Sequence, residues 1–332
     1  MSLNTGEWFN TDLADIKCGV EIELLLLDSK TKALLANEDK LLSVLGRIKS
    51  IKGAENIFKD FYTYQLEIRT KPHDTPQDVV SEIKKLYAVA YKEFIKERIY
   101  IIPAPSIARE GVPAYCGLHA HISYPKEKSK ETYFKKAMGM LPFIYSLADH
   151  CKNFEISPLH TSDRISKSHH IGLPELDMIR WLTGDYQNPK YRDIIFSPPI
   201  TTDDNPSRMK KPATIEIRIL DTPSLFHYFE FMVYFIMNLA GKIKTNNPMI
   251  TLLKDERDET NNRLNMTRHL LINQRYGVNK IFRMLSSDVC EQASREFNIK
   301  FPRETQFEFR EKKGYSGDIN GFLSMAVEGD WI

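Results

Sequence analysis

Four segments of the chain alternate apolar and polar residues with a period of two, which is typical of β-strands that have one buried face. They cover residues 19–28, 62–70, 117–125 and 214–221. In the last segment, TIEIRILD, three isoleucines share one face, whereas Glu216 and Arg218 share the other. The pattern therefore predicts four strands, each with an apolar face and a strongly polar face.

Apolar residues with helical spacing lie between and after these strands. They predict helices around residues 38–50, 75–94, 129–152 and 224–244. The pairs Thr75-Pro76 and Thr222-Pro223 each combine a favourable N-cap with a residue suited to the first helical turn. Residues 157–213 are mostly loop-like, and the part after about residue 248 is mostly helical. Strands that alternate with helices in this way predict an α+β or α/β sheet.

The polar faces of the four strands contain an unusual set of side chains. They are Glu21 and Glu23; Gln65, Glu67 and Arg69; His119, His121 and Ser123; and Glu216 and Arg218. If the strands belong to one sheet whose apolar face packs on helices, these side chains share the other face. Neighbouring carboxylates repel one another and raise one another's pKa values, so bound cations would stabilise the ionised cluster. Hard oxygen ligands with a few imidazoles suit Mg²⁺ or Mn²⁺.

Each motif also has a simpler interpretation when it is taken alone. An E-x-E pair in a strand is usually a solvated face, and an E-x-R pair is more often a cross-strand ion pair. The H-x-H pair is more specific, because two imidazoles on one strand face are a common ligand geometry. The metal hypothesis therefore depends on the coincidence of all four strands.

Composition narrows the class of protein. The chain has 332 residues, of which 42% are apolar and 27% are charged, as in soluble globular proteins. A formal net charge of +2 gives no overall attraction to nucleic acid or to an anionic membrane. Four cysteines without a CxxC pair argue against a thiolate zinc site and fit a reducing cytosol. We therefore expect a cytoplasmic protein that binds neither nucleic acid nor membrane.

The N-terminus and the most apolar segment of the chain support the same expectation. The first residues lack the basic and then apolar pattern of a signal peptide. The most apolar segment, residues 224–244, is interrupted by His227, Glu230 and Asn238, so it predicts a buried core helix and not a membrane span.

The order of the four motifs resembles a known family. The sequence contains G-x-E-x-E, then L-E-x-R-T-x-P, then G-x-H-x-H and finally I-E-x-R-x-x-D, within residues 17–225. It has neither a GxxxxGK[ST] loop nor a kinase HRD and DFG set. In this order the motifs resemble those of the carboxylate–amine ligases. These include the type 2 glutamate–cysteine ligases, which share their catalytic sheet with glutamine synthetase.

The resemblance implies a fold and a reaction. The fold would be α+β, with a curved, mostly antiparallel sheet that forms a funnel-shaped active site and helices on its outer face. Residues 1–332 would form one catalytic domain, with the motifs at 17–225 and a mainly helical part at 226–332. With Mg²⁺ or Mn²⁺, ATP would phosphorylate a carboxylate, and an amine would then attack the acyl phosphate to form an amide, such as a γ-glutamyl amide. The partners would be small amino-acid substrates, and relatives are often homo-oligomers.

The resemblance also implies roles for individual residues. The metal ligands would be Glu21, Glu23, Glu67, His119 and Glu216. The catalytic residues would be Glu67, Glu216 and Arg218. His121 and Arg218 would bind the nucleotide, and Arg69 and Arg164 would bind substrate. His169 and His170 have no counterpart in the family pattern.

Two other functions stay open at this point. H-x-H is also an entry motif of amidohydrolases, so a metal-dependent hydrolase is one alternative. A non-catalytic member of the ligase fold that binds only nucleotide or metal is the other. The pair of substrates that a ligase would join is also open.

Overall fold

The protein is described here by a computed structural model that defines most of the chain in separate stretches. The described residues are 5–107, 114–127, 129–152, 155–156, 161–162, 194–197, 214–246, 289–316, 319–328 and 331.

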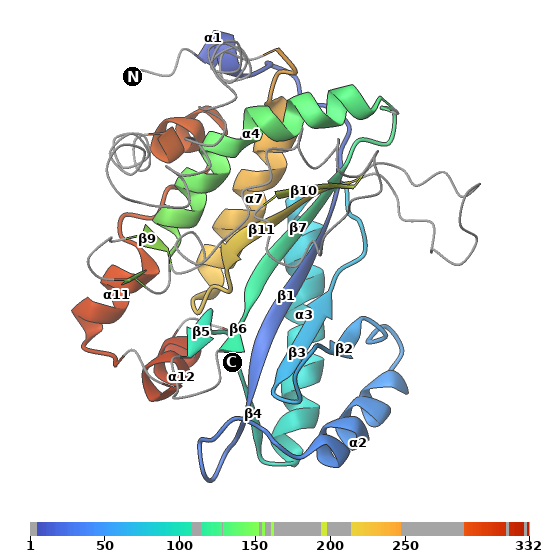
Figure 1. Ribbon diagram of the computed structural model, residues 1–332, viewed down its shortest axis with the longest axis vertical. Coiled ribbons are helices and arrows are strands. Elements are labelled where there is room, and N and C mark those ends of the chain that lie inside the picture. The colour runs from blue at the N-terminus through green and yellow to red at the C-terminus, as the bar shows by residue number, and fades with distance from the viewer. Residues whose placement is uncertain are drawn as a thin grey trace, which may run out of the picture.

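A seven-stranded sheet is the centre of the described structure (Figure 1). Its strands are β1 (Lys17–Asp28), β2 (Ile57–Lys59), β3 (Gln65–Arg69), β4 (Ile99–Ile102), β7 (Gly117–Ser123), β10 (Ile194–Ser197) and β11 (Thr214–Asp221). The order is β10-β11-β7-β1-β3-β2, and β4 pairs with the far end of β1. Every strand pair within it is antiparallel. The prediction of an α+β fold with a mostly antiparallel sheet is therefore confirmed, while the funnel and the curvature stay predictions.

The four predicted strands have the two faces that their sequence indicates. On β1, Val20, Ile22 and Leu24 are fully or almost fully buried, and Glu21 and Glu23 project from the opposite face. The apolar face packs on helices, and its burial is the main favourable term for the association of these elements.

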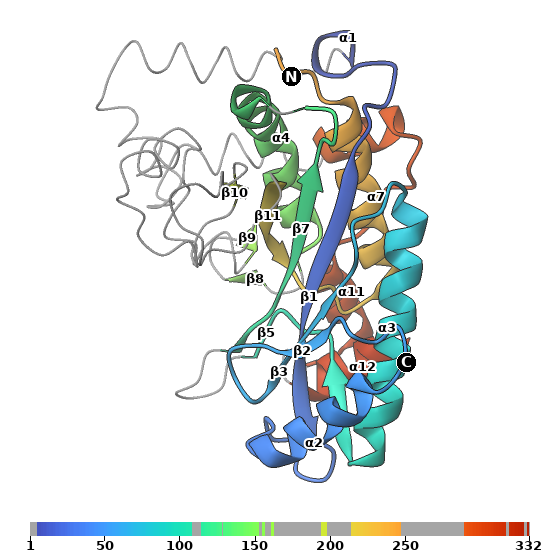
Figure 2. The ribbon, with the colours of Figure 1, turned by 90° about the vertical axis from the view of Figure 1, so that its right-hand side faces the viewer.

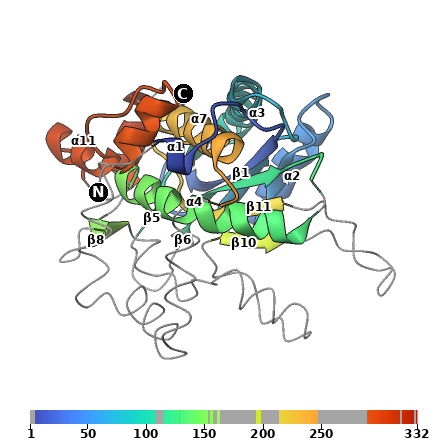
Figure 3. The ribbon, with the colours of Figure 1, turned by 90° about the horizontal axis from the view of Figure 1, so that it is seen from above.

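Three long helices pack on the sheet. The described helices are α1 (Thr5–Trp8), α2 (Glu38–Lys49), α3 (Pro76–Lys96), α4 (Lys130–His150), α7 (Phe226–Lys242), α11 (Gln306–Lys313) and α12 (Ile319–Glu328). Helix α3 packs on β1, β3 and β4, α7 packs on β7, and α4 packs on β10 and β11. Figure 2 shows α3 and α7 along the same side of the sheet, and Figure 3 shows α4 beside α7. Thr75 caps α3 as predicted, because its hydroxyl accepts a hydrogen bond from the backbone N–H of Asp78.

The predicted start of the fourth helix is wrong. Helix α7 begins at Phe226, its N-cap position is Leu225, and no side chain caps it. The Thr222 hydroxyl instead donates a 2.8 Å hydrogen bond to the carbonyl oxygen of Glu23, so Thr222 ties the end of β11 to β1. The Ser224 hydroxyl likewise donates to the Pro103 carbonyl. None of the helices in the described part of the chain has the length and apolar composition that a membrane crossing requires.

Several short strands were not predicted. Strand β2 follows helix α2 in the sequence, and β4 follows helix α3. Strand β10 lies inside residues 157–213, the region predicted to be mostly loop-like. Two small two-stranded sheets are also present, formed by β5 (Ser106–Ile107) with β6 (Ala114–Tyr115) and by β8 (Glu155–Ile156) with β9 (Thr161–Ser162). Within the described C-terminal residues, 289–296, α11 and α12 are helical, and the division of the chain into a motif-bearing core and a mainly helical part stays a prediction.

A buried histidine at the end of α4 makes the fold sensitive to acid. The His150 ring stacks on Phe301 with ring centroids 4.1 Å apart, and its Nε2 lies 3.0 Å from the Pro302 carbonyl oxygen. Burial lowers the pKa of His150 to about 4, which outweighs the opposite effects of the Pro302 hydrogen bond and Glu308; Lys152 lowers this pKa further. An unfolded histidine titrates near pH 6.5, so the unfolded chain takes up this proton first as the pH falls.

The free energy of unfolding is therefore expected to fall by about 2 kcal/mol from this group between pH 7.5 and 5. Urea denaturation of the wild type and of His150→Phe at the two pH values measures the effect, because phenylalanine keeps a stacked ring but cannot bind the proton. The variant should lose that part of the pH dependence, whereas His227→Gln, on an exposed site of α7, should keep it. Equal pH dependence in the wild type and in His150→Phe would contradict the assignment.

Candidate active site

The register of the central strands places the predicted polar residues side by side. On the two sides of β1, Glu23 pairs with Glu67 of β3 and Glu21 pairs with His119 of β7. One strand further, His121 of β7 pairs with Glu216 of β11. Directly opposed residues on one face have Cβ atoms about 5 Å apart, so their side chains are neighbours.

His119 lies between the two glutamates of β1. Its Nδ1 is 3.5 Å from an Oε2 oxygen of Glu21, and its Nε2 is 3.7 Å from an Oε1 oxygen of Glu23. Its side chain is only 3% exposed, and neither ring nitrogen has a hydrogen-bond partner within the described part of the chain. A buried imidazole with two unsatisfied nitrogens is costly, and a cation bound between these groups would remove that cost.

His121, Glu216 and Arg218 extend the cluster towards β11. The His121 Nε2 lies 3.6 Å from Glu21 and 4.0 Å from Glu216, and the Arg218 guanidinium forms an ion pair with Glu216. The ladder between β11 and β7 is irregular here, because Ile217 pairs with Ala120 and Leu220 already pairs with Leu118. Two residues of β11 therefore lie opposite His119 alone, which is the arrangement of a β-bulge.

Arg69 links the cluster to β3 on its other side. Its guanidinium forms an ion pair with Glu67, and its Nε lies 3.4 Å from Glu21. Figure 2 shows β1, β3 and β7 beside one another in the sheet, and the contacts given above join the polar side chains of these strands and of β11. Of the five residues predicted as metal ligands, Glu21 contacts His119 directly, and Glu23, Glu67 and Glu216 are linked to Glu21 through His119, Arg69 and His121, respectively. Their roles as ligands stay predictions.

The carboxylates of the cluster differ in acidity. Burial raises the pKa of Glu67 to about 7, and nearby Glu21 adds to this rise against the effect of Arg69. Burial also opposes ionisation of Glu21, but the side chains of His119, His121 and Arg69 outweigh it and hold its pKa well below the usual range. The pKa of Glu216 is lowered for a similar reason, since Arg218 and both histidines outweigh burial.

Asp60 is a further member of the cluster that the motif analysis missed. One oxygen each of Glu23, Asp60 and Glu67 lies within 4.8 Å of the other two. Asp60 lies in the turn between β2 and β3, outside any alternating strand, and only the hairpin pairing of these strands brings it to the site. The backbone N–H of Gly117 donates a 2.8 Å hydrogen bond to Glu23 and helps to orient this carboxylate.

The residues present fit a divalent cation. Carboxylate oxygens with one or two imidazoles, and no thiolate, form the donor set that suits Mg²⁺ or Mn²⁺. Three mutually close carboxylates and the unsatisfied His119 are the observations that favour it. Arg164, which is predicted to bind substrate, lies outside the described residues, as do His169 and His170.

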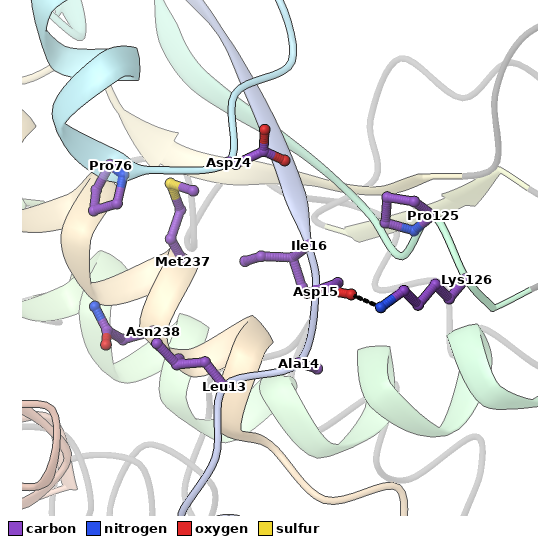
Figure 4. A pocket seen from close by; sticks show the side chains of 10 residues that line it. All are labelled: Leu13, Ala14, Asp15, Ile16, Asp74, Pro76, Pro125, Lys126, Met237 and Asn238. Atoms are coloured by element: carbon purple, nitrogen blue, oxygen red, sulfur yellow. Dashed lines mark ion pairs between the residues drawn. The ribbon is translucent and has the colours of Figure 1, made fainter.

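Two hollows in the described structure lie away from this cluster. One, of about 440 Å³, lies among the segment before β1, the loop after β7 and α7, and an ion pair between Asp15 and Lys126 borders it (Figure 4). The other, of about 560 Å³, lies between α7 and residues 299–309. Neither is lined by any residue of the cluster.

Comparison with known proteins identifies the fold. No family model matches the sequence, and no curated protein matches it significantly. Among solved structures, a bifunctional glutathione synthetase from Pasteurella multocida matches 95% of this chain with a TM-score of 0.54 and 13% identity. A glutamate–cysteine ligase from Francisella tularensis in complex with AMP matches 96% of the chain with a TM-score of 0.52 and 14% identity.

The chain spans about half of the first protein, 51% of its length, and 89% of the second. Both matches extend over almost the entire chain. These similarities show that the chain has the fold of the carboxylate–amine ligases.

Proposed function

We propose that the protein is an ATP-dependent carboxylate–amine ligase that uses Mg²⁺ or Mn²⁺. One observation supports this most directly: Glu21, Glu23, Glu67, His119 and Glu216 lie on one face of four adjacent antiparallel strands. The shared fold with a glutamate–cysteine ligase supports it independently.

The reaction would proceed in two steps. A substrate carboxylate oxygen attacks the γ-phosphorus of ATP, the bond to the β–γ bridging oxygen breaks, and ADP and an acyl phosphate form. The amine nitrogen then attacks the acyl carbon, phosphate leaves with the bonding electrons, and the nitrogen loses a proton as the amide forms. Both steps concentrate negative charge, so they require positioning and charge neutralisation more than a covalent catalyst.

Each group of side chains has a role in this scheme. Bound Mg²⁺ or Mn²⁺ would neutralise the charge on the phosphates. The cluster carboxylates, with Asp60 added to the predicted set, and His119 would hold the cations. Arg218 would stabilise the transferred phosphoryl group through its forked donors, and His121 would lie beside the phosphates. Arg69 and Arg164 would bind substrate carboxylate.

A substrate screen tests the proposal. Purified protein with Mg-ATP is expected to release ADP only when an amino-acid carboxylate and an amine are both present, and a coupled assay measures that release over pairs of amino acids. EDTA should abolish the release, and added Mg²⁺ or Mn²⁺ should restore it.

The two alternatives predict different results in the same assay. An amidohydrolase would form product from an amide without ATP. A binding-only protein would retain nucleotide in the presence of metal and would release no ADP with any pair. Either result would exclude the ligase proposal.

A further inference from the structure

The hollow between α7 and residues 299–309 lies outside the proposed reaction centre. Its volume is about 560 Å³, which is within the size range of small-molecule sites. One face of α7 forms the first wall, because the lining residues 227, 230, 231 and 234 recur at helical spacing. Residues 299–304 and Phe309 of α11 form the opposite wall.

Aromatic side chains dominate the lining of this hollow. They are Tyr228, Phe231, Tyr234, Phe301 and Phe309. Five of the twelve lining residues are therefore aromatic, against 11% of the whole chain. Such a lining offers flat apolar surfaces that suit a ring of a ligand.

Contacts behind the lining hold the two walls in place. The Phe301 ring stacks on buried His150, with centroids 4.1 Å apart, and meets the Phe231 ring edge to face at 5.9 Å. The Tyr228 hydroxyl donates a hydrogen bond to the carbonyl oxygen of Glu304, which ties α7 to the opposite wall. The hollow is therefore preformed, so ligand binding would cost little conformational entropy of the protein.

The charged side chains around the hollow favour an anionic group. Lys300 and Arg303 are exposed residues of the wall opposite α7, and neither forms an ion pair with another described residue. Of the two lining glutamates, Glu304 is paired with Lys312 at 3.3 Å, which leaves Glu230 of α7 to oppose two cations. A carboxylate beside Arg303 would form charge-assisted hydrogen bonds, which are stronger than neutral ones.

We propose that this hollow binds a small molecule that carries an aromatic ring and a carboxylate. The ring packs among the aromatic side chains, and the carboxylate pairs with Arg303 and Lys300. The site shares no lining residue with the cluster on the sheet, so the proposal does not depend on the ligase function.

Ligand-observed NMR titrations of the full chain, without ATP or divalent metal, test the proposal. The probes are 3-phenylpropionate, phenethylamine, which keeps the ring but has the opposite charge, and hexanoate, which keeps the carboxylate but lacks the ring. We expect 3-phenylpropionate to bind with a Kd of about 1 mM or lower, in line with its small size. The other two probes should bind about 10-fold more weakly, because each lacks one of the two recognised groups.

Substitutions in the two walls locate the bound probe. Arg303→Gln should raise the Kd of 3-phenylpropionate about 10-fold, because it removes a charged partner of the carboxylate. Tyr234→Ala should raise it about 5-fold through the loss of one aromatic contact. Lys300→Gln is an independent charge variant at a second exposed position. Thermal denaturation checks that each variant is folded.

Matched variants away from the hollow control for general effects. Arg295→Gln removes another exposed arginine, Tyr91→Ala removes a half-exposed tyrosine of α3, and neither residue lines the hollow. Both should bind 3-phenylpropionate as the wild type does. The proposal is overturned if this probe does not bind at ten times the expected Kd, or if phenethylamine or hexanoate binds equally well. An unchanged Kd in Arg303→Gln or in Tyr234→Ala would also overturn it, because the probe would then occupy another site.

Discussion

Replacing Glu23 with glutamine is expected to lower ATP turnover more than about 100-fold while the protein stays folded. Even residues that only orient a metal ligand change affinity or activity about 10- to 100-fold, and Glu23 is a proposed direct ligand. Its carboxylate lies 3.7 Å from His119 and within 4.8 Å of Asp60 and Glu67. Glutamine has nearly the same shape and can still accept the hydrogen bond from Gly117, but it removes the charge that attracts the cation.

Stability should change in the opposite direction from activity. Without bound cations, the carboxylates of Asp60, Glu67 and Glu23 repel one another, so removing one charge should leave thermal stability equal or higher. The tie between Thr222 and the Glu23 carbonyl involves the backbone and survives the substitution. Glu216→Gln is expected to lower turnover in the same way at the other end of the cluster, but without the gain in stability, because it removes the partner of Arg218.

The measurement combines ADP release at saturating substrates with thermal denaturation. Glu38→Gln is the matched control, because Glu38 is a half-exposed glutamate of α2 whose ion-pair partner, Lys59, is not one of the proposed ligands. That variant should retain normal turnover. Near-normal turnover in Glu23→Gln or in Glu216→Gln would refute the ligase assignment.

Arg218→Lys is expected to lower kcat about 100-fold and to change the KM for ATP only a few-fold. Lysine keeps the positive charge but loses the planar fork that binds two phosphate oxygens at once. A group that stabilises developing charge contributes more in the transition state than in the ground state, and removal of one such donor costs about 10² to 10³ in kcat. Its ion pair with Glu216 would weaken as well.

Pre-steady-state and steady-state rates with Mg-ATP distinguish a slower chemical step from weaker ATP binding. Arg295→Lys serves as the control, because Arg295 is an exposed arginine that pairs with Glu291 on a helix turn. It should leave both constants unchanged. If Arg218→Lys weakened ATP binding as much as it slowed turnover, Arg218 would have a general binding role and no special role in the transition state.

The elements that could be predicted from the sequence are those with local signals. Helix α3 begins where Thr75 and Pro76 indicate, because the capping hydrogen bond links residues three apart. Helix α7 does not begin at Thr222-Pro223, because the Thr222 hydroxyl bonds to Glu23, which is far away in the sequence. Strand β2 has three residues, too few for its alternation to be distinguished from a turn.

The strand residues of the site could also be predicted from the sequence, because they too have a local signal. The face to which Glu21 or Glu216 points is a local property with a period of two, so it could be assigned before the strand order was known. Asp60 has no such period, and its place depends on the pairing of β2 with β3. The contacts between Glu21 and His119 likewise depend on register, which the alternation leaves open by steps of two residues.

The irregular pairing in β11 affects how this chain is aligned with others. With strict alternation, Leu220 would share a face with Glu216, but the doubled position opposite His119 shifts the second half of the strand, so that Leu220 is buried against Leu118. An alignment to a regular strand therefore needs a one-residue gap between Ile217 and Leu220. Without that gap, either Glu216 or Leu220 would be aligned with a residue that lies on the opposite face of the other protein's strand.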